Sequence, residues 1–261
     1  MTLSVAHLSD PHVTSGALAA EPAAGLHRAL GEVLTLDPRP TCVIITGDLV
    51  DHGLPDEYAA LREILDHFPL PLHLAAGNHD DRETLRDAFG GGPHLGEGRS
   101  TRYLVEHLGV TVVVLDSLVL GSPGGRLGEE QRTWLDAALR RRPDVPAVVC
   151  LHHPPVPVGI PFLDGMGLSD GAELEEVIAR HPHVVRVLAG HVHRSTFTSF
   201  AHAILSTAPS TYRQSALRMN SDGPPGYVHA SPGFQLHQST GRGWVTHTVR
   251  VGHEGAPVGH Y

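Results

Sequence analysis

Short apolar segments alternate, along the first three quarters of the chain, with segments whose apolar residues recur at helical spacing. Six apolar runs are predicted to be strands, at 3–8, 42–46, 70–76, 110–116, 145–152 and 184–190. Several are apolar at every position, which is typical of strands that are covered on both faces. Helical stripes between them lie around residues 58–68, 134–139 and 174–178. The alternation predicts an α/β fold with helical crossovers.

The pattern changes after Gly190. Segments 195–200, 203–207, 233–238 and 244–251 alternate apolar with polar residues and have no helical spacers. This predicts antiparallel strands that close a second sheet. Segments rich in proline and glycine at 90–93, 122–125 and 223–226 predict loops, and none resembles an interdomain linker. We therefore expect residues 1–261 to form a single domain with a strand-rich C-terminal part from about residue 195.

Composition excludes several classes of protein. The net charge is −9 and basic runs are absent, which argues against a nucleic-acid polymer as partner. No apolar stretch approaches the roughly 20 residues of a membrane helix, and the N-terminus has no signal-peptide pattern. Two cysteines are too few to staple the fold, which suits a reducing cytoplasm, the expected location. The 21 histidines raise the hypothesis of a metal site.

Five predicted strands are followed by turns that carry metal-binding side chains. The turns are SDPH, GDLVDHG, GNHDD, LHHPP and GHVHR. They supply Asp10, His12, Asp48, Asn78, His79, His152, His153, His191 and His193. In open α/β sheets ligands bind at the C-terminal edge of the strands, so these turns are expected to converge there.

The residue types in these turns suit hydrolysis assisted by two metals. If Asp10 and His12 lie on an extended segment, their spacing of two places them on one side, where both can bind one ion. His191 and His193 have the same spacing, and the two oxygens of Asp48 can bridge two ions. Two divalent ions roughly 3.5–4 Å apart lower the pKa of a shared water from 15.7 towards about 7. Such a positive pocket suits an anionic phosphoester.

Taken in order, D-P-H, G-D, G-N-H-D, H-H-P-P and G-H-V-H resemble the motifs of the calcineurin-like metallophosphoesterase superfamily. Within it the chain is similar to the bacterial class III cyclic nucleotide phosphodiesterases and the related glycerophosphodiesterases. The similarity covers most of the chain and includes the APSTYRQ segment after GHVHR. It implies a four-layer α/β/β/α sandwich with two mixed β-sheets, in agreement with the predicted strands.

The resemblance also implies a set of ligands for two divalent metal ions. The first ion would be held by Asp10, His12 and His193. The second would be held by Asn78, His152 and His191, and Asp48 would bridge the two. Manganese, iron, zinc and cobalt all accept this set of nitrogen and oxygen ligands.

The roles in catalysis follow from the same resemblance. Asp48 and His79 would be the catalytic residues, and Asn78, His79 and His191 would contact the substrate. A metal-bound hydroxide would attack phosphorus in line while His79 assists the departing alkoxide. The expected substrate is a small phosphodiester such as a cyclic nucleotide or a glycerophosphodiester. Relatives form dimers or larger assemblies, so a homo-oligomer is expected.

Other interpretations of single residues stay open at this point. Asp10 could be a turn residue, and Asn78 could simply tolerate a positive φ. His79 could orient a metal ligand instead of touching the substrate. His153 is expected to be structural, because the family uses the first histidine of that pair.

The choice of substrate rests on two positions. Phosphoprotein phosphatases place arginines in V-D-R-G and R-G-N-H-E, where they clamp a dianionic monoester. The corresponding residues here are His52 and Ala76, which favours a monoanionic diester. Hydrolysis of phosphomonoesters or phosphonate monoesters on the same site is the alternative, and a non-catalytic interaction scaffold is another. Segment 157–168 is a candidate wall of the substrate pocket.

Overall fold

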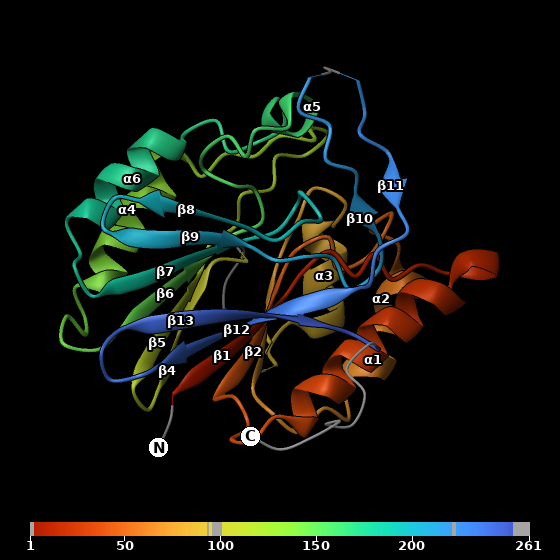
Figure 1. The fold of residues 1–261 in the computed structure, drawn as a ribbon, viewed down its shortest axis with the longest axis horizontal. Helices are drawn as coiled ribbons and strands as arrows, with labels where there is room; N and C mark the ends of the chain where they lie inside the picture. The colour runs from red at the N-terminus through yellow and green to blue at the C-terminus, as the bar shows by residue number, and fades with distance from the viewer. Residues whose placement is uncertain (1–2, 93, 96–100, 221–222, 253–261) are drawn as a thin grey trace, which may run out of the picture.

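Two mixed β-sheets lie face to face, with helices on the outer side of each, in the computed structural model (Figure 1). The structure describes residues 3–92, 94–95, 101–220 and 223–252. The expected four-layer α/β/β/α sandwich is confirmed. The strand order explains how turns far apart in the sequence come to one edge.

The first sheet has five strands in the order β13-β12-β1-β2-β3. They are β1 (Ser4–Leu8), β2 (Cys42–Thr46), β3 (Leu72–Ala75), β12 (Gly233–Ser239) and β13 (Trp244–Arg250). The strands β1, β2 and β3 are parallel, whereas β12 runs antiparallel to both β1 and β13. The outer face of this sheet is covered by α1 (Ala20–Thr35), α2 (Pro55–Leu65) and α3 (Arg82–Phe89).

The second sheet has six strands in the order β4-β5-β6-β7-β9-β8. They are β4 (Tyr103–His107), β5 (Val110–Val114), β6 (Ala147–Cys150), β7 (Val184–Ala189), β8 (Thr196–Phe200) and β9 (Ala203–Thr207). The four central strands are parallel, and the two edge strands are antiparallel to their neighbours. Helices α4 (Gly128–Leu139) and α6 (Gly171–Ala179) cover the outer face.

Alternation along β5 divides the hydrophobic core into two layers. Val110, Val112 and Val114 pack towards the first sheet, and Val113 packs towards α4 and α6. Because successive strand residues point to opposite faces, a strand buried on both sides must be apolar throughout. This is the physical reason that the apolar runs predicted strands so well.

Four smaller elements complete the fold. They are the 3₁₀ turn η1 (Gly16–Leu18), α5 (Pro161–Asp164), β10 (Gln214–Ser215) and β11 (Tyr227–Val228). Figure 1 shows β10 and β11 extending to the same end of the molecule as α5. None of the helices in the described part of the chain is long and apolar enough to cross a membrane.

One expectation about the C-terminal part is wrong. Its strands do not together close a second sheet, because β8 and β9 join the six-stranded sheet whereas β12 and β13 join the five-stranded one. The same alternation of apolar and polar residues suits either sheet, so the pattern could not assign the partners. That residues 1–261 form one domain remains a prediction.

Candidate metal centre

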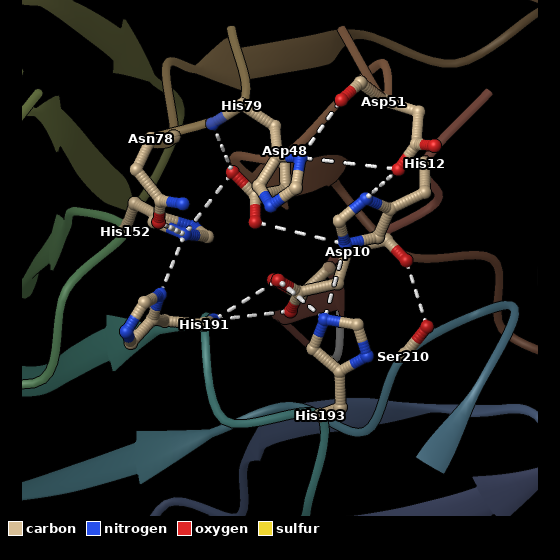
Figure 2. Close-up of polar contacts among 12 residues, drawn as sticks. Asp10, His12, Asp48, Asp51, Asn78, His79, His152, His191, His193 and Ser210 are labelled. Atoms are coloured by element: carbon tan, nitrogen blue, oxygen red, sulfur yellow. Dashed lines mark hydrogen bonds and ion pairs between the residues drawn. The ribbon is translucent and has the colours of Figure 1, made fainter. Parts of the chain in front are cut away.

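The turns that follow β1, β2, β3, β6 and β7 meet at one end of the sandwich. Figure 2 shows the side chains of His12, His152, His191 and His193 gathered around Asp48. All five are at most 7% exposed. The structure therefore brings together the polar residues of all five motifs, as their positions at strand ends predicted.

The backbone of the centre adopts an unusual conformation. The φ angles of Asp10, His12, Asp48, His191 and His193 lie between 45° and 70°. The only other non-glycine residue with positive φ in the described ranges is Ala201. Left-handed backbone costs an L-residue roughly 1–2 kcal/mol, so surrounding contacts must impose it.

The expectation that Asp10 and His12 share one face of an extended segment is therefore wrong. Both residues lie in a turn beyond β1, where left-handed backbone aims their side chains at the same centre.

Two glycines let the turns approach one another. A Cβ at Gly77 would lie 2.3 Å from the Asp48 carboxylate oxygen Oδ1, and a Cβ at Gly190 would lie 2.9 Å from Oδ2 of Asp10. Each glycine therefore brings the turn after one strand against the carboxylate that follows another. No larger residue fits at either position without moving the centre.

The first half of the centre contains Asp10, His12, His193 and one oxygen of Asp48. His12 Nε2 lies 3.1 Å from His193 Nε2 and 3.6 Å from Asp48 Oδ2, and His193 Nε2 lies 3.4 Å from Asp10 Oδ1. The carboxylate of Asp10 also accepts the backbone N–H of His191 at 3.1 Å. Four ligand atoms from these residues lie within 4.8 Å of one another.

The hydrogen bonds outside this half determine which ring nitrogens carry protons. Nδ1 of His12 donates to the Asp51 carboxylate at 3.0 Å, and Nδ1 of His193 donates to the Arg213 carbonyl at 2.8 Å. Since both partners can only accept, each neutral ring presents a bare Nε2 lone pair inward. Two such lone pairs at 3.1 Å repel unless a cation or a proton lies between them.

The second half of the centre follows the same plan. His152 donates from Nδ1 to the carbonyl of Thr46 at 2.7 Å. Its Nε2 then faces Asn78 Oδ1 at 3.1 Å, Asp48 Oδ1 at 3.3 Å and His191 Nδ1 at 3.3 Å. Asp48 thus contributes one oxygen to each half, and acceptors again converge where a cation would relieve their repulsion.

The pKa values of the metal-free centre reflect this convergence. Burial disfavours a charged ring at His152, but Asp48 and Asp10 outweigh it and raise the pKa of His152 to about 9. At His12 burial is likewise outweighed by Asp51, Asp48 and Asp10, which raise its pKa. Burial lowers the pKa of His191 and His193. In each half the histidine whose pKa is raised, His12 or His152, lies where a cation fits, because the neighbouring carboxylates favour positive charge there.

His79 lies beside the centre with a different set of contacts. Its backbone N–H donates to Asp48 Oδ1 at 2.9 Å, and its ring Nδ1 donates to the Asp51 carbonyl at 2.8 Å. The side chain is 41% exposed and borders the central cavity. Nε2 of His79 is therefore free to meet a molecule in that cavity.

Two carboxylates that the motifs contained were missed as functional residues. Asp51 orients His12 from its side chain and His79 from its carbonyl oxygen. Asp80 accepts the backbone N–H groups of Leu49 and Gly77 at 3.1 and 2.8 Å, which joins the turn after β2 to the turn after β3. Burial raises the pKa of Asp80 to about 6. Their position inside the motifs GDLVDHG and GNHDD was the only sequence signal for a functional role. In such turns Asp51 and Asp80 cannot be told from solvated turn residues.

The remaining motif residues lie outside the two halves. His153 is buried, and both its ring nitrogens are engaged, with Ser117 Oγ at 2.8 Å and the Pro123 carbonyl at 3.2 Å. Asp81 is the N-cap of α3 and accepts the Thr84 N–H at 2.9 Å. The ring of His52 hydrogen-bonds Glu57 at 2.8 Å and does not line the cavity over the centre.

A cavity of about 250 Å³ opens over the centre. One side is formed by Phe162 and Leu163 of α5 and by Met166, all within the segment 157–168. The other side is formed by residues 224–227, at the start of β11. The wall is mainly apolar, and the polar groups of the metal centre form the floor.

Comparisons with known proteins agree with this geometry. The sequence model of the calcineurin-like phosphoesterase family matches residues 3–195. A probable glycerophosphodiester phosphodiesterase GpdQ from Arcobacter nitrofigilis is 32% identical, over 98% of this chain and 96% of its own length. The 3',5'-cyclic adenosine monophosphate phosphodiesterase CpdA from Pseudomonas aeruginosa is 31% identical, over 80% of this chain and 76% of its own.

Two solved structures share the fold at low sequence identity. A dimetal phosphatase from Danio rerio superposes with a TM-score of 0.66 at 16% identity, over 95% of this chain and 99% of that one. GAP50, described as the anchor in the inner membrane complex of Plasmodium, gives a TM-score of 0.66 at 14% identity over 96% and 88%. A phosphatase and an anchor share this architecture, so function must be argued from the site.

Proposed function

Since this chain belongs to the calcineurin-like phosphoesterase family, we propose that it is a metal-dependent hydrolase of small phosphodiesters. One observation carries the proposal beyond family membership. Acceptor atoms converge in two adjacent groups that share Asp48, and in each group positive charge is required to relieve their mutual repulsion. Buried acceptors that converge in this way destabilise the fold in the absence of metal, and an anchoring function does not require them.

The donor set fits two divalent ions, which we assign to the two halves of the centre. Asp10, His12 and His193 would hold one ion, Asn78, His152 and His191 the other, and Asp48 would bridge them. The nitrogen and oxygen donors suit manganese, iron, zinc and cobalt alike. When bound, the ions supply positive charge for the phosphoryl oxygens and acidify a water for attack on phosphorus.

The chain's own side chains complete the reaction site. Asn78 and His191 lie where they can touch a phosphoryl oxygen above the centre. His79, held by Asp51, presents Nε2 to the cavity and can stabilise the leaving oxygen or give it a proton. The apolar wall from Phe162 to Met166 would cover the alcohol part of the substrate.

The charge of the cavity favours a diester over a monoester. None of the described residues that line it is an arginine, and His52 and Ala76 stand where phosphoprotein phosphatases carry arginines. A monoester dianion would lack the guanidinium forks that usually bind its extra charge. Relatives named as glycerophosphodiester and cyclic nucleotide phosphodiesterases support the same substrate class.

The test compares two chromogenic substrates on protein reconstituted with Mn²⁺ or Zn²⁺. We expect bis(p-nitrophenyl) phosphate to be hydrolysed with a higher kcat/KM than p-nitrophenyl phosphate. Cyclic AMP and glycerophosphodiesters would then identify the natural class. A preference for the monoester would refute the charge argument, and no turnover of any ester by metal-loaded protein would refute the enzyme.

The assignment of Asp48 as the shared metal ligand can be tested in the same assay with a pair of variants. Asp48→Asn removes the shared carboxylate charge and is expected to reduce activity at least ~100-fold. Glu63→Gln, on the surface of α2, changes charge equally and is expected to leave the rate unchanged. Equal activity in both variants would overturn the assignment of Asp48.

A further inference from the structure

A second cluster of metal-binding side chains lies between the two sheets, away from the candidate metal centre. Cys42 is the first residue of β2, His73 lies in β3 and His107 is the last residue of β4. One donor atom from each lies within 4.8 Å of the others. The four steps of β2 from Cys42 to Thr46 span ~13 Å at 3.3 Å per residue, and Asp48 follows beyond Thr46, so the cluster and the candidate metal centre lie at opposite ends of the strand.

We propose that Cys42, His73 and His107 bind a structural metal ion of the thiolate-preferring class, of which Zn²⁺ is the type. This inference does not depend on the proposed phosphodiesterase activity. It concerns a different set of residues and a different kind of ligand. Within the described ranges, this is the only group of neighbouring metal-binding side chains that contains sulfur.

One buried nitrogen of the cluster lacks the partner that a buried polar group requires. His73 is 2% exposed, and its Nδ1 makes no hydrogen bond. A buried unsatisfied nitrogen costs roughly 1–3 kcal/mol, so its presence needs an explanation. The other nitrogen, Nε2, lies 2.8 Å from Nε2 of His107. Two imidazoles and a thiol held together in an apolar interior form a ligand set that a cation would complete.

Protonation in the metal-free state leaves the cluster uncharged. Burial raises the pKa of Cys42 to about 12 and lowers the pKa of His73 to about 3. Neutral imidazole is the form that coordinates a metal. The thiol would release its proton to solvent as the sulfur–metal bond forms, which leaves one net positive charge on the site.

The three residues of the cluster differ in their exposure. His107 is half-buried at the turn between β4 and β5, whereas Cys42 and His73 are buried. Three protein ligands would leave the fourth place of a tetrahedral site to a water, which would lie on the side of His107. Strands from both sheets supply ligands, so the ion would fasten β4 of one sheet to β2 and β3 of the other.

Cobalt substitution tests the site without reference to activity. Co²⁺ bound to a thiolate gives an intense near-ultraviolet charge-transfer band, whereas the candidate metal centre has no sulfur and cannot give one. We expect the wild-type protein to show the band, Cys42→Ser to lose it, and Cys150→Ser to keep it. Cys150 is the matched control, because it too is buried and unpaired.

Metal content supplies an independent measurement. Zinc-loaded Cys42→Ser is expected to hold one equivalent less than wild type by mass spectrometry, while its Mn²⁺-dependent diester hydrolysis stays unchanged. Absence of the band in wild type, or its survival in Cys42→Ser, would overturn the proposal. If Cys42→Ser fails to fold by circular dichroism, His107→Gln at the partly exposed turn decides, with at least ~10-fold weaker Co²⁺ binding expected.

Discussion

Three of the four histidines assigned as metal ligands differ from other buried histidines in the partners of their rings, whereas His191 faces the centre with Nδ1 and its Nε2 has no partner. His12, His152 and His193 each donate outward from Nδ1 and direct Nε2 to the centre. His7, also buried, bonds the Thr46 hydroxyl from Nε2, and burial lowers its pKa to about 3. The outward hydrogen bond fixes both tautomer and ring direction, which is what a metal ligand requires.

Among the single residues, His79 gives the sharpest test of a catalytic contact. His79→Ala is expected to lower kcat ~100-fold or more on a diester, because it removes an exposed imidazole whose Nε2 faces the cavity. Metal content by mass spectrometry should not change. His67→Ala is the control, since that side chain is exposed beyond the end of α2 and does not line the cavity, so its loss should spare the rate. Loss of metal in His79→Ala would instead make His79 an organiser of the centre.

The turns that carry the centre depend on backbone that can approach closely. Gly190→Ala would place a Cβ 2.0 Å from Ser9 Oγ and 2.8 Å from the Thr46 carbonyl. We expect a loss of about 1–3 kcal/mol in the free energy of unfolding, measured by urea denaturation. Gly31→Ala, in α1 with open space around it, should raise stability by ~0.5–1 kcal/mol. Equal effects at both positions would show that Gly190 is not constrained by the centre.

The contact between α4 and the end of α6 predicts a dependence of stability on pH. Burial opposes the charge of Asp136, but hydrogen bonds from His181 at 2.9 Å and Arg180 at 3.2 Å hold its pKa below the ordinary value. A lowered carboxyl pKa stabilises the fold above the unfolded pKa of about 4, and that stability is lost as pH falls further.

The variant Asp136→Asn should therefore be ~1 kcal/mol less stable than wild type at pH 7. The difference should shrink in urea titrations below about pH 4, where Asp136 becomes protonated in the unfolded chain first and in the folded protein only at lower pH. Asp66→Asn, which breaks only the exposed pair with Arg62, should cost less than ~0.5 kcal/mol. A difference at Asp136 that stays constant from pH 7 to pH 3.5 would contradict the role of its charge.

Elements with one strong pattern were predictable and those with mixed signals were not. The strands β2, β5, β6 and β7 follow from apolar runs, and the centre follows from polar turns at their ends. Helix α1 escaped prediction, because Pro22, Gly25 and Gly31 interrupt its apolar stripe, although Leu26 and Val33 are buried. Strand β4 is a half-exposed edge with weak alternation. The left-handed turns were also beyond prediction, since contacts between distant segments impose them.

Across the whole molecule, the metal centre links the two sheets. Residues after β1 and β2 supply one side and residues after β6 and β7 the other, so ions held there as proposed would stabilise the folded sandwich against the unfolded chain. At 100 times the dissociation constant one ion adds about 2.7 kcal/mol. For a chain of this size that corresponds to a rise in Tm of roughly 5–10 °C.

Chelated protein titrated with Mn²⁺ in a thermal unfolding assay should show that rise. Asp48→Asn, which lacks the shared carboxylate charge, should show a much smaller one at equal Mn²⁺. An identical shift in both proteins would mean that the ion stabilises the fold from another site. Manganese is the suitable probe, because the sulfur-containing cluster at Cys42 prefers softer ions.

The pairing of β1 with β12 has a consequence for how the protein is made. Strand β1 is synthesised well before β12, so one of its two edges has no partner until β12 follows. Until then β1 presents an open edge, the kind of surface on which strands of other nascent chains can add. A product ending at residue 195, where the family match ends, would keep that edge permanently. Removal of β12 and β13 should therefore lower the yield of folded protein, because the open edge of β1 would persist.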